Sequence, residues 1–124
     1  MSRFTIYHNP RCSKSRQTLA LLTDNGITPE IIEYLKAPLD QVKLNAICEK
    51  LEKEPLEWMR TNEVRFKELE LSKNDKRSRD EWMSILADNP ILIERPIVVS
   101  GDQAVLGRPP ENVLELIGCA AKSN

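Results

Sequence analysis

The sequence is poor in several features that mark large classes of protein. It has one histidine, three cysteines and a formal net charge of -1 over 124 residues. The cysteines, Cys12, Cys48 and Cys119, are odd in number and far apart, which argues against a disulfide scaffold. With one histidine and no C-x-x-C sequence, no structural zinc or other metal site is expected. The balanced charge argues against a nucleic-acid-binding protein that works through bulk positive charge.

Signals for membranes or export are also missing. No apolar run approaches the length needed to cross a bilayer. The N-terminus, Met-Ser-Arg-Phe-Thr-Ile, leads into a strand pattern instead of an apolar leader with a cleavage site. We therefore expect a cytoplasmic protein without membrane contact. Hydrophobic residues make up 40% and charged residues 30%, which fits one globular domain over residues 1–124.

The pattern along the chain predicts an α/β protein. A strand is followed by a helix that begins near Cys12 or Ser13 and stops at Gly26, which suits a left-handed C-cap. A helical insertion over about 39–90 separates this opening from a hairpin with a tight turn at Gly101-Asp102. The strands are predicted over 3–7, 30–35, 96–100 and 103–106, and the last helix from Asn112 to about Ala120.

This order, β-α-β, helical insertion, β-β-α, is that of a thioredoxin-like fold with a four-stranded mixed sheet. The first two strands are expected to be parallel, because a helix connects them. Arg95-Pro96 would begin the third strand beside Cys12. A cis peptide is predicted there, because cis bonds are largely confined to proline.

Helical spacing predicts the inward faces of the insertion. A short helix starts at Pro55, and the charged stretch 75–79 is expected to be a loop before a helix over 80–88. Cys48 lies on an apolar face, and neither it nor Cys119 has a basic cluster beside it. Both are therefore expected to pack as small apolar residues. The predicted inward residues are Leu44, Ile47, Cys48, Leu51, Trp58, Met59, Trp82, Ile85 and Leu86.

Cys12 lies between the first predicted strand and the first predicted helix. A helix N-terminus offers free backbone N–H groups and the positive end of the helix dipole, which stabilise a thiolate and an oxyanion. Arg11, Lys14 and Arg16 would lower the thiol pKa further. Cys12 is thus a candidate nucleophile. The alternative is a small residue at a helix start without chemistry, which its polar neighbours disfavour.

Two further side chains are candidates around this sulfur. His8 could hydrogen-bond the sulfur or assist loss of its proton, or it could be a strand-end histidine bonded to backbone or water. Ser15, three residues after Cys12, is better placed to reach the sulfur than Ser13, although both could be helix-start hydroxyls only.

The segment "HNPRCSKSR" resembles the active-site signature of the glutaredoxin-coupled arsenate reductases, the ArsC-like branch of the thioredoxin superfamily. The segments "WMRTNE", "NPILIERPIVV" and "LGRPPENVLELIG" also match family segments, in the same order. The likeness covers nearly the whole chain, from Phe4 to Gly118.

The resemblance implies a mechanism. Cys12 would attack arsenate, and Arg60, Arg95 and Arg108 would bind the oxyanion. Glutathione as co-substrate and glutaredoxin as partner would complete the reduction, with no tightly bound cofactor, and the chain is expected to be a monomer. Guanidinium groups suit oxyanions because they donate two parallel hydrogen bonds. By itself, each arginine could also be an ordinary solvated or structural charge.

The sequence bears on three rival functions. Low-molecular-weight-phosphatase-like arsenate reductases need C-x5-R, but Thr18 stands at the arginine position. A general glutathione-dependent thiol oxidoreductase of the same fold would share Cys12 and the glutathione step. A redox regulator that binds RNA polymerase would carry C-x-x-C as its switch, whereas Ser15 occupies the second position here.

Overall fold

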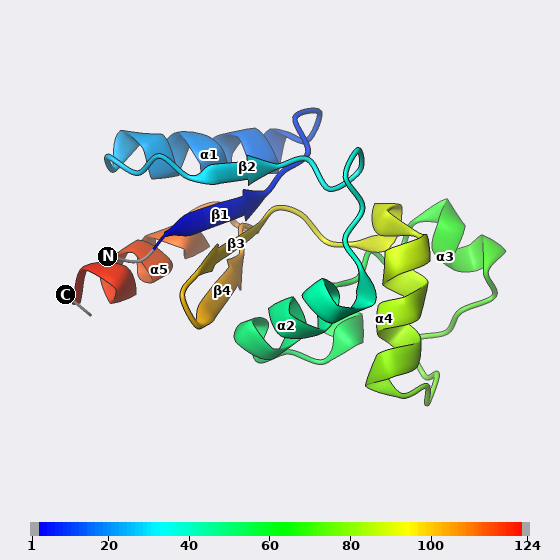
Figure 1. The fold of residues 1–124 in the computed structure, drawn as a ribbon. Helices are drawn as coiled ribbons and strands as arrows, with labels where there is room; N and C mark the ends of the chain where they lie inside the picture. The colour runs from blue at the N-terminus through cyan, green and yellow to red at the C-terminus, as the bar shows by residue number, and fades with distance from the viewer. Residues whose placement is uncertain (1–2, 123–124) are drawn as a thin grey trace. The chain divides into compact units, whose positions relative to one another are not determined.

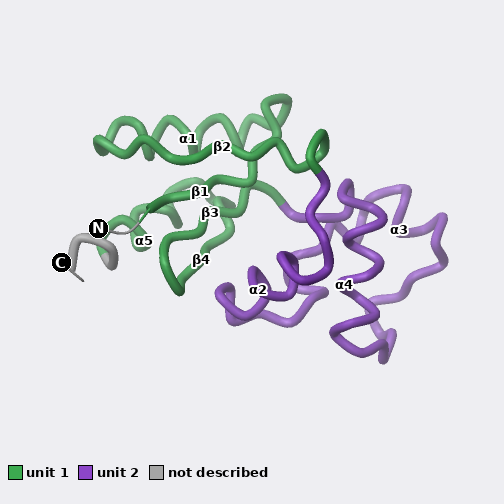
Figure 2. Tube along the Cα trace, viewed as in Figure 1, with its two compact units in different colours: residues 1–37, 95–124 green, residues 38–94 purple. Residues whose placement is uncertain are grey.

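The computed structural model describes the backbone of residues 3–122 and the side chains of residues 3–118. The chain forms two compact units, one of residues 1–37 with 95–124 and one of residues 38–94 (Figure 2). The second unit coincides closely with the predicted helical insertion. The single domain over residues 1–124 stays a prediction.

The first unit holds a four-stranded sheet in the order β2-β1-β3-β4. β1 pairs parallel to β2, whereas β3 is antiparallel to both β1 and β4. The mixed sheet, its parallel opening and the thioredoxin-like order are therefore confirmed. The elements of this unit (Figure 1) are β1 (Phe4–Tyr7), α1 (Ser13–Asp24), β2 (Glu30–Ile32), β3 (Ile97–Ser100), β4 (Gln103–Leu106) and α5 (Asn112–Lys122).

One hydrophobic core joins this sheet to α1 and α5. The side chains of Phe4 and Ile6 share one face of β1, because side chains alternate along a strand, and they pack with Leu22 of α1. A large apolar side chain contributes about 1.5–3 kcal/mol when it is fully buried. Tertiary packing of these residues therefore fixes the helices on the sheet. The core consists of Phe4, Ile6, Leu22, Val98, Val113 and Leu116.

The ends of the elements mostly follow the predictions. α1 is flanked by Cys12 and Asn25, and Gly26 has the expected left-handed φ of 76°. β2 is shorter than the predicted 30–35. The carbonyl of Glu33 accepts hydrogen bonds from the amides of Lys36 and Ala37, which closes a turn and ends the strand. The predicted cis peptide at Arg95-Pro96 is present, and Arg108-Pro109 is also cis.

The second unit is helical, as predicted. Ser78 and Glu81 form a reciprocal capping box at the beginning of α4. Of its predicted inward residues Ile85 is only partly buried, whereas Met83, which was not predicted, is fully buried. The elements of this unit are α2 (Gln41–Leu51), η1 (Pro55–Trp58), α3 (Val64–Glu68), α4 (Arg79–Asp88) and η2 (Pro90–Leu92).

Between residues 3 and 122, no helix is both long and apolar enough to cross a membrane. In the same residues, no three His, Cys, Asp or Glu side chains gather as a metal-binding group.

Candidate active site

Strand register brings three distant segments together in the first unit. Tyr7, the last residue of β1, pairs with Ile97, the first residue of β3. Ile97 also pairs with Leu106, the last residue of β4. The segment that leads to Cys12, the pair Arg95-Pro96 and the pair Gly107-Arg108 therefore leave the sheet at the same end. Three of the predicted site residues come from these segments.

Cys12 is the N-cap residue of α1, as its place in the sequence predicted. Its backbone is extended, with φ -94° and ψ 123°, and its own carbonyl accepts the amide of Arg16 at 3.0 Å. The Cys12 amide donates to the carbonyl of Asn9 at 3.0 Å, which closes the turn before the helix. The residue is 9% exposed. The sulfur is thus largely enclosed and lies beside the free amides of the first helical turn.

These surroundings favour the thiolate. Burial alone would raise the pKa of the Cys12 thiol, but the backbone amide of Ser15, the Arg95 guanidinium and the amide of Lys14 together lower that pKa below its ordinary value. The amides of the first turn of α1 thus face the sulfur and favour its negative charge. A lowered thiol pKa is the property expected of a nucleophilic cysteine.

Arg95 lies next to this sulfur with part of its donor capacity unused. Its Nε and Nη1 atoms are buried, and within residues 3–122 neither has a hydrogen-bond partner. A buried donor without a partner costs about 1–3 kcal/mol, more when it is charged. A negatively charged oxygen beside Cys12 would relieve that cost. Arg95 is therefore well suited to bind an oxyanion.

The Arg108 side chain is hydrogen-bonded to the backbone of Arg95. Its Nη1 donates to the Arg95 carbonyl at 3.2 Å, and its side chain is exposed. The Asn112 side chain donates from Nδ2 to the carbonyls of Leu106 and Arg108, at 3.0 and 3.2 Å, and so holds the loop between β4 and α5. The structure thus places the Arg108 guanidinium beside the backbone of Arg95. The role of the two arginines as oxyanion ligands stays a prediction.

His8 and Ser15 are in direct contact. His8 Nδ1 lies 2.6 Å from Ser15 Oγ, and the His8 amide donates to the Ile32 carbonyl at 2.8 Å. Ser15 is fully buried, and its hydroxyl also accepts the Asn9 amide at 3.1 Å. Burial lowers the pKa of His8, with Glu33 opposing and Arg16 adding to the shift, so the ring is neutral at pH 7. Ser15 therefore fixes the loop that carries Cys12.

The sequence analysis did not single out Asn9. Its Oδ1 accepts the amide of Arg11 at 3.0 Å, and its own amide bonds Ser15. The Arg16 guanidinium donates to the Pro10 carbonyl at 2.9 Å in the same loop. The Asn-Pro pair was a usable signal, because asparagine side chains often accept an amide two residues further along.

Arg60 belongs to the second unit. Its backbone amide donates to the Leu92 carbonyl at 2.7 Å. Its Nη1 forms an ion pair with Glu63 Oε2 at 3.0 Å and lies 3.4 Å from the Ile91 carbonyl. The Arg60 guanidinium is therefore engaged by a carboxylate of its own unit. Its role as an oxyanion ligand stays a prediction.

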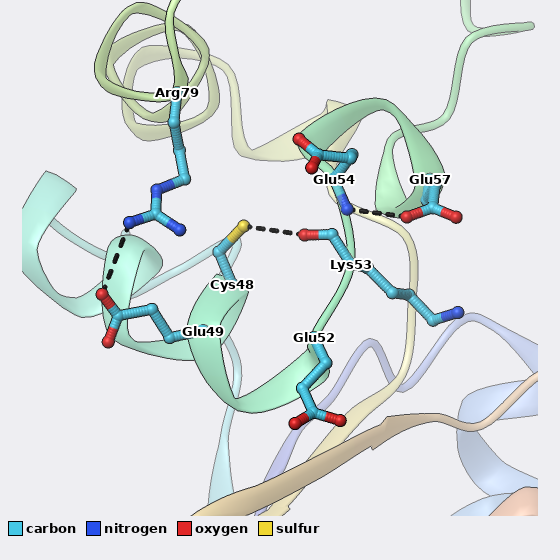
Figure 3. Close-up of a pocket in the computed structure, with 7 residues that line it drawn as sticks. All are labelled: Cys48, Glu49, Glu52, Lys53, Glu54, Glu57 and Arg79. Atoms are coloured by element: carbon cyan, nitrogen blue, oxygen red, sulfur yellow. Dashed lines mark hydrogen bonds and ion pairs between the residues drawn. The ribbon is translucent and has the colours of Figure 1, made fainter.

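Cys48 shows how a cysteine without these features differs from Cys12. It is 1% exposed, as expected of an apolar packing residue, and its thiol donates to the Lys53 carbonyl at 3.3 Å (Figure 3). Burial raises the pKa of the Cys48 thiol, although Arg79 partly opposes the rise. The side chain of Cys119 lies outside the described residues. A pocket of about 480 Å³ adjoins Cys48 and is lined by Cys48, Glu49, Glu52, Lys53, Glu54, Glu57 and Arg79.

Comparison with known proteins agrees with this geometry. Residues 7–116 match the sequence model of the ArsC family. The chain is 46% identical to an arsenate reductase of Haemophilus influenzae, over 90% of this chain and 97% of the relative. It is 37% identical to an arsenate reductase of Escherichia coli, over 99% of this chain and 86% of the relative.

A solved structure is similar in fold as well as in sequence. An arsenate reductase from Vibrio cholerae matches with a TM-score of 0.87 and 46% identity, and the match covers 92% of this chain and 97% of that one. The match to the family model spans the loop that carries Cys12 and the segments that carry Arg95 and Arg108. The chain belongs to the ArsC family.

Proposed function

We propose that the protein is an arsenate reductase in which Cys12 is the nucleophile and glutathione and glutaredoxin supply the electrons. The observation that carries the proposal is the pair formed by Cys12, whose thiol pKa is lowered, and the buried, unpartnered Nε and Nη1 of Arg95. A nucleophile and a donor set for an oxyanion lie side by side. The arsenate reductases among the relatives support arsenate as the oxyanion.

The proposed reaction has three steps. The Cys12 thiolate attacks arsenic(V) and displaces hydroxide, which leaves as water after protonation. Arg95 and Arg108 stabilise the negative charge on the arsenate oxygens as that bond breaks. The glutathione sulfur then attacks the arsenic adduct and displaces a second hydroxide, which leaves as water after protonation. Both As–S bonds break as a disulfide forms between Cys12 and glutathione, so two electrons pass to arsenic and arsenite departs as As(III).

The last step restores the enzyme. Departure of arsenite leaves Cys12 and glutathione joined by a disulfide, which a glutaredoxin thiol opens. An external thiol is needed because the nearest position that could hold a resolving cysteine is Ser15, whose hydroxyl bonds His8 and Asn9. His8 and Ser15 act in this proposal as positioning residues for the Cys12 loop. Arg60 is proposed as a third oxyanion ligand, from its match to the family segment.

The test is arsenate turnover in an NADPH-coupled assay with glutathione and glutaredoxin. We expect measurable turnover that disappears in Cys12→Ser. The matched control is Cys48→Ala, which removes the other described cysteine, a protonated and buried one, and should keep turnover. Replacement of glutaredoxin with thioredoxin identifies the reductant, and activity with thioredoxin alone would refute the glutaredoxin step.

A native protein without arsenate turnover would contradict the proposal. Release of glutathione from a glutathionylated peptide, still dependent on Cys12, would then favour the general thiol oxidoreductase that shares the same nucleophile.

A further inference from the structure

Gly107 lies at a point of very close approach in the first unit. A Cβ atom at this position would be 2.5 Å from Thr18 Oγ1 and 2.7 Å from Pro96 Cγ. A Cβ atom does not approach a non-bonded carbon or oxygen atom so closely, so any side chain at position 107 would force its neighbours to move. The backbone of Gly107 is not left-handed, unlike that of Gly26 and Gly101. Glycine is therefore required by the space around it and not by its φ angle.

The partners of Gly107 are held firmly in place. Thr18 on α1 is fully buried, and its Oγ1 donates to the Lys14 carbonyl at 2.8 Å. The same hydroxyl lies 3.4 Å from the Gly107 carbonyl. The Gly107 amide donates to the Pro96 carbonyl at 2.9 Å. Neither Thr18 nor Pro96 can give way without breaking a hydrogen bond or opening the core.

The two residues that a side chain at position 107 would meet, Thr18 and Pro96, each lie in a segment that carries a proposed residue of the active site. Gly107 immediately precedes Arg108, and Pro96 immediately follows Arg95. Thr18 lies on α1, the helix whose N-cap is Cys12. The spacing between α1 and the two arginine-bearing segments therefore depends on how closely Gly107 approaches Thr18.

We propose that Gly107 and Thr18 are positioning residues that set the distance from Arg95 and Arg108 to the Cys12 sulfur. The proposal rests on the proposed function, because it is the oxyanion reaction at Cys12 that requires the two arginines. Neither residue touches the reacting atoms. The lowered pKa of the Cys12 thiol depends in part on Arg95, so a shift of that segment should be visible at the sulfur itself.

The test compares Gly107→Ala with a matched glycine. Gly118→Ala is the control, because a Cβ there meets nothing within 4 Å. We expect Gly107→Ala to raise the Cys12 thiol pKa, measured by thiolate absorbance, and to lower kcat/KM for arsenate by about 10²-fold. Gly118→Ala should change neither. In the double variant Thr18→Ala/Gly107→Ala, loss of the Thr18 Oγ1 and Cγ2 atoms opens space on the α1 side, so the alanine Cβ can move away from Pro96 Cγ, and most of both values should be restored.

The outcomes separate this proposal from the proposed function. A wild-type thiol pKa and an unchanged kcat/KM for arsenate in Gly107→Ala would overturn the positioning role. A thiol pKa that is raised in Gly107→Ala and returns to the wild-type value in the double variant supports the positioning role. This holds even if the native chain shows no arsenate turnover, and in that case only the proposed function fails. If Gly107→Ala does not fold, the double variant decides: a folded protein with a wild-type pKa supports the role. A pKa that stays raised, or a double variant that is also unfolded, refutes it.

Discussion

Replacing Ser15 with alanine tests whether the buried hydroxyl holds the loop of Cys12. The substitution removes one oxygen at a fully buried position and leaves the helix backbone intact. Two groups lose their partner, namely Nδ1 of His8, 2.6 Å from the hydroxyl, and the amide of Asn9, 3.1 Å from it. No water-filled space replaces the lost oxygen, because one atom leaves too small a gap.

The expected loss of stability follows from these two contacts. A buried polar group without a partner costs about 1–3 kcal/mol. Because the Asn9 amide is only part-buried and costs less than the buried His8 Nδ1, the free energy of unfolding should fall by about 2–4 kcal/mol. Single domains have about 5–15 kcal/mol of stability, so the variant should remain folded. The loop that presents Cys12 should then be less well fixed.

The measurement is urea unfolding of Ser15→Ala beside Ser13→Ala. Ser13 lies two residues before Ser15 on the same helix and is exposed. Loss of its hydroxyl should therefore change the free energy of unfolding by less than about 0.5 kcal/mol. If both variants lose the same small amount, the contact between His8 and Ser15 does not hold the loop, and the reasoning fails.

Two further predictions concern the charges around the sulfur. Arg95→Ala should raise the pKa of the Cys12 thiol, because less positive charge then opposes the effect of burial. Arg95→Lys should keep part of the lowering of that pKa. Equal thiolate titrations for the native protein and Arg95→Ala would contradict this prediction. Burial lowers the pKa of His8, so the folded protein favours the neutral ring. The stability that this neutral ring contributes is fully present above the ordinary pKa of about 6.5 and is lost as pH falls through the folded pKa. The free energy of unfolding of the native chain should therefore fall on acidification, with a slope of at most about 1.4 kcal/mol per pH unit. In His8→Gln this part of the slope should vanish, and an unchanged slope in urea titrations would count against a buried neutral His8.

Much of the fold follows from local features of the sequence. Alternating apolar residues mark β1, and Gly26 ends α1 because only a residue without a Cβ adopts its φ of 76° at little cost. The position of Cys12 at the start of that helix was also readable, because the strand pattern stops at Asn9-Pro10 and the helical pattern begins soon after. These signals lie within a few residues of one another.

The assembly of the site depends on contacts between residues far apart in the sequence. The register that pairs Tyr7 with Ile97, and Ile97 with Leu106, decides that the segments carrying Cys12, Arg95 and Arg108 leave the sheet at the same end. Nothing in the local pattern showed that Ser15 would bond His8, that Arg60 would pair with Glu63, or that Gly107 would press against Thr18. The sequence by itself determined which elements form and where the nucleophile stands, since backbone propensities act locally. Only the tertiary structure decided which donors surround the sulfur, because packing of α1 and the sheet brings those segments together.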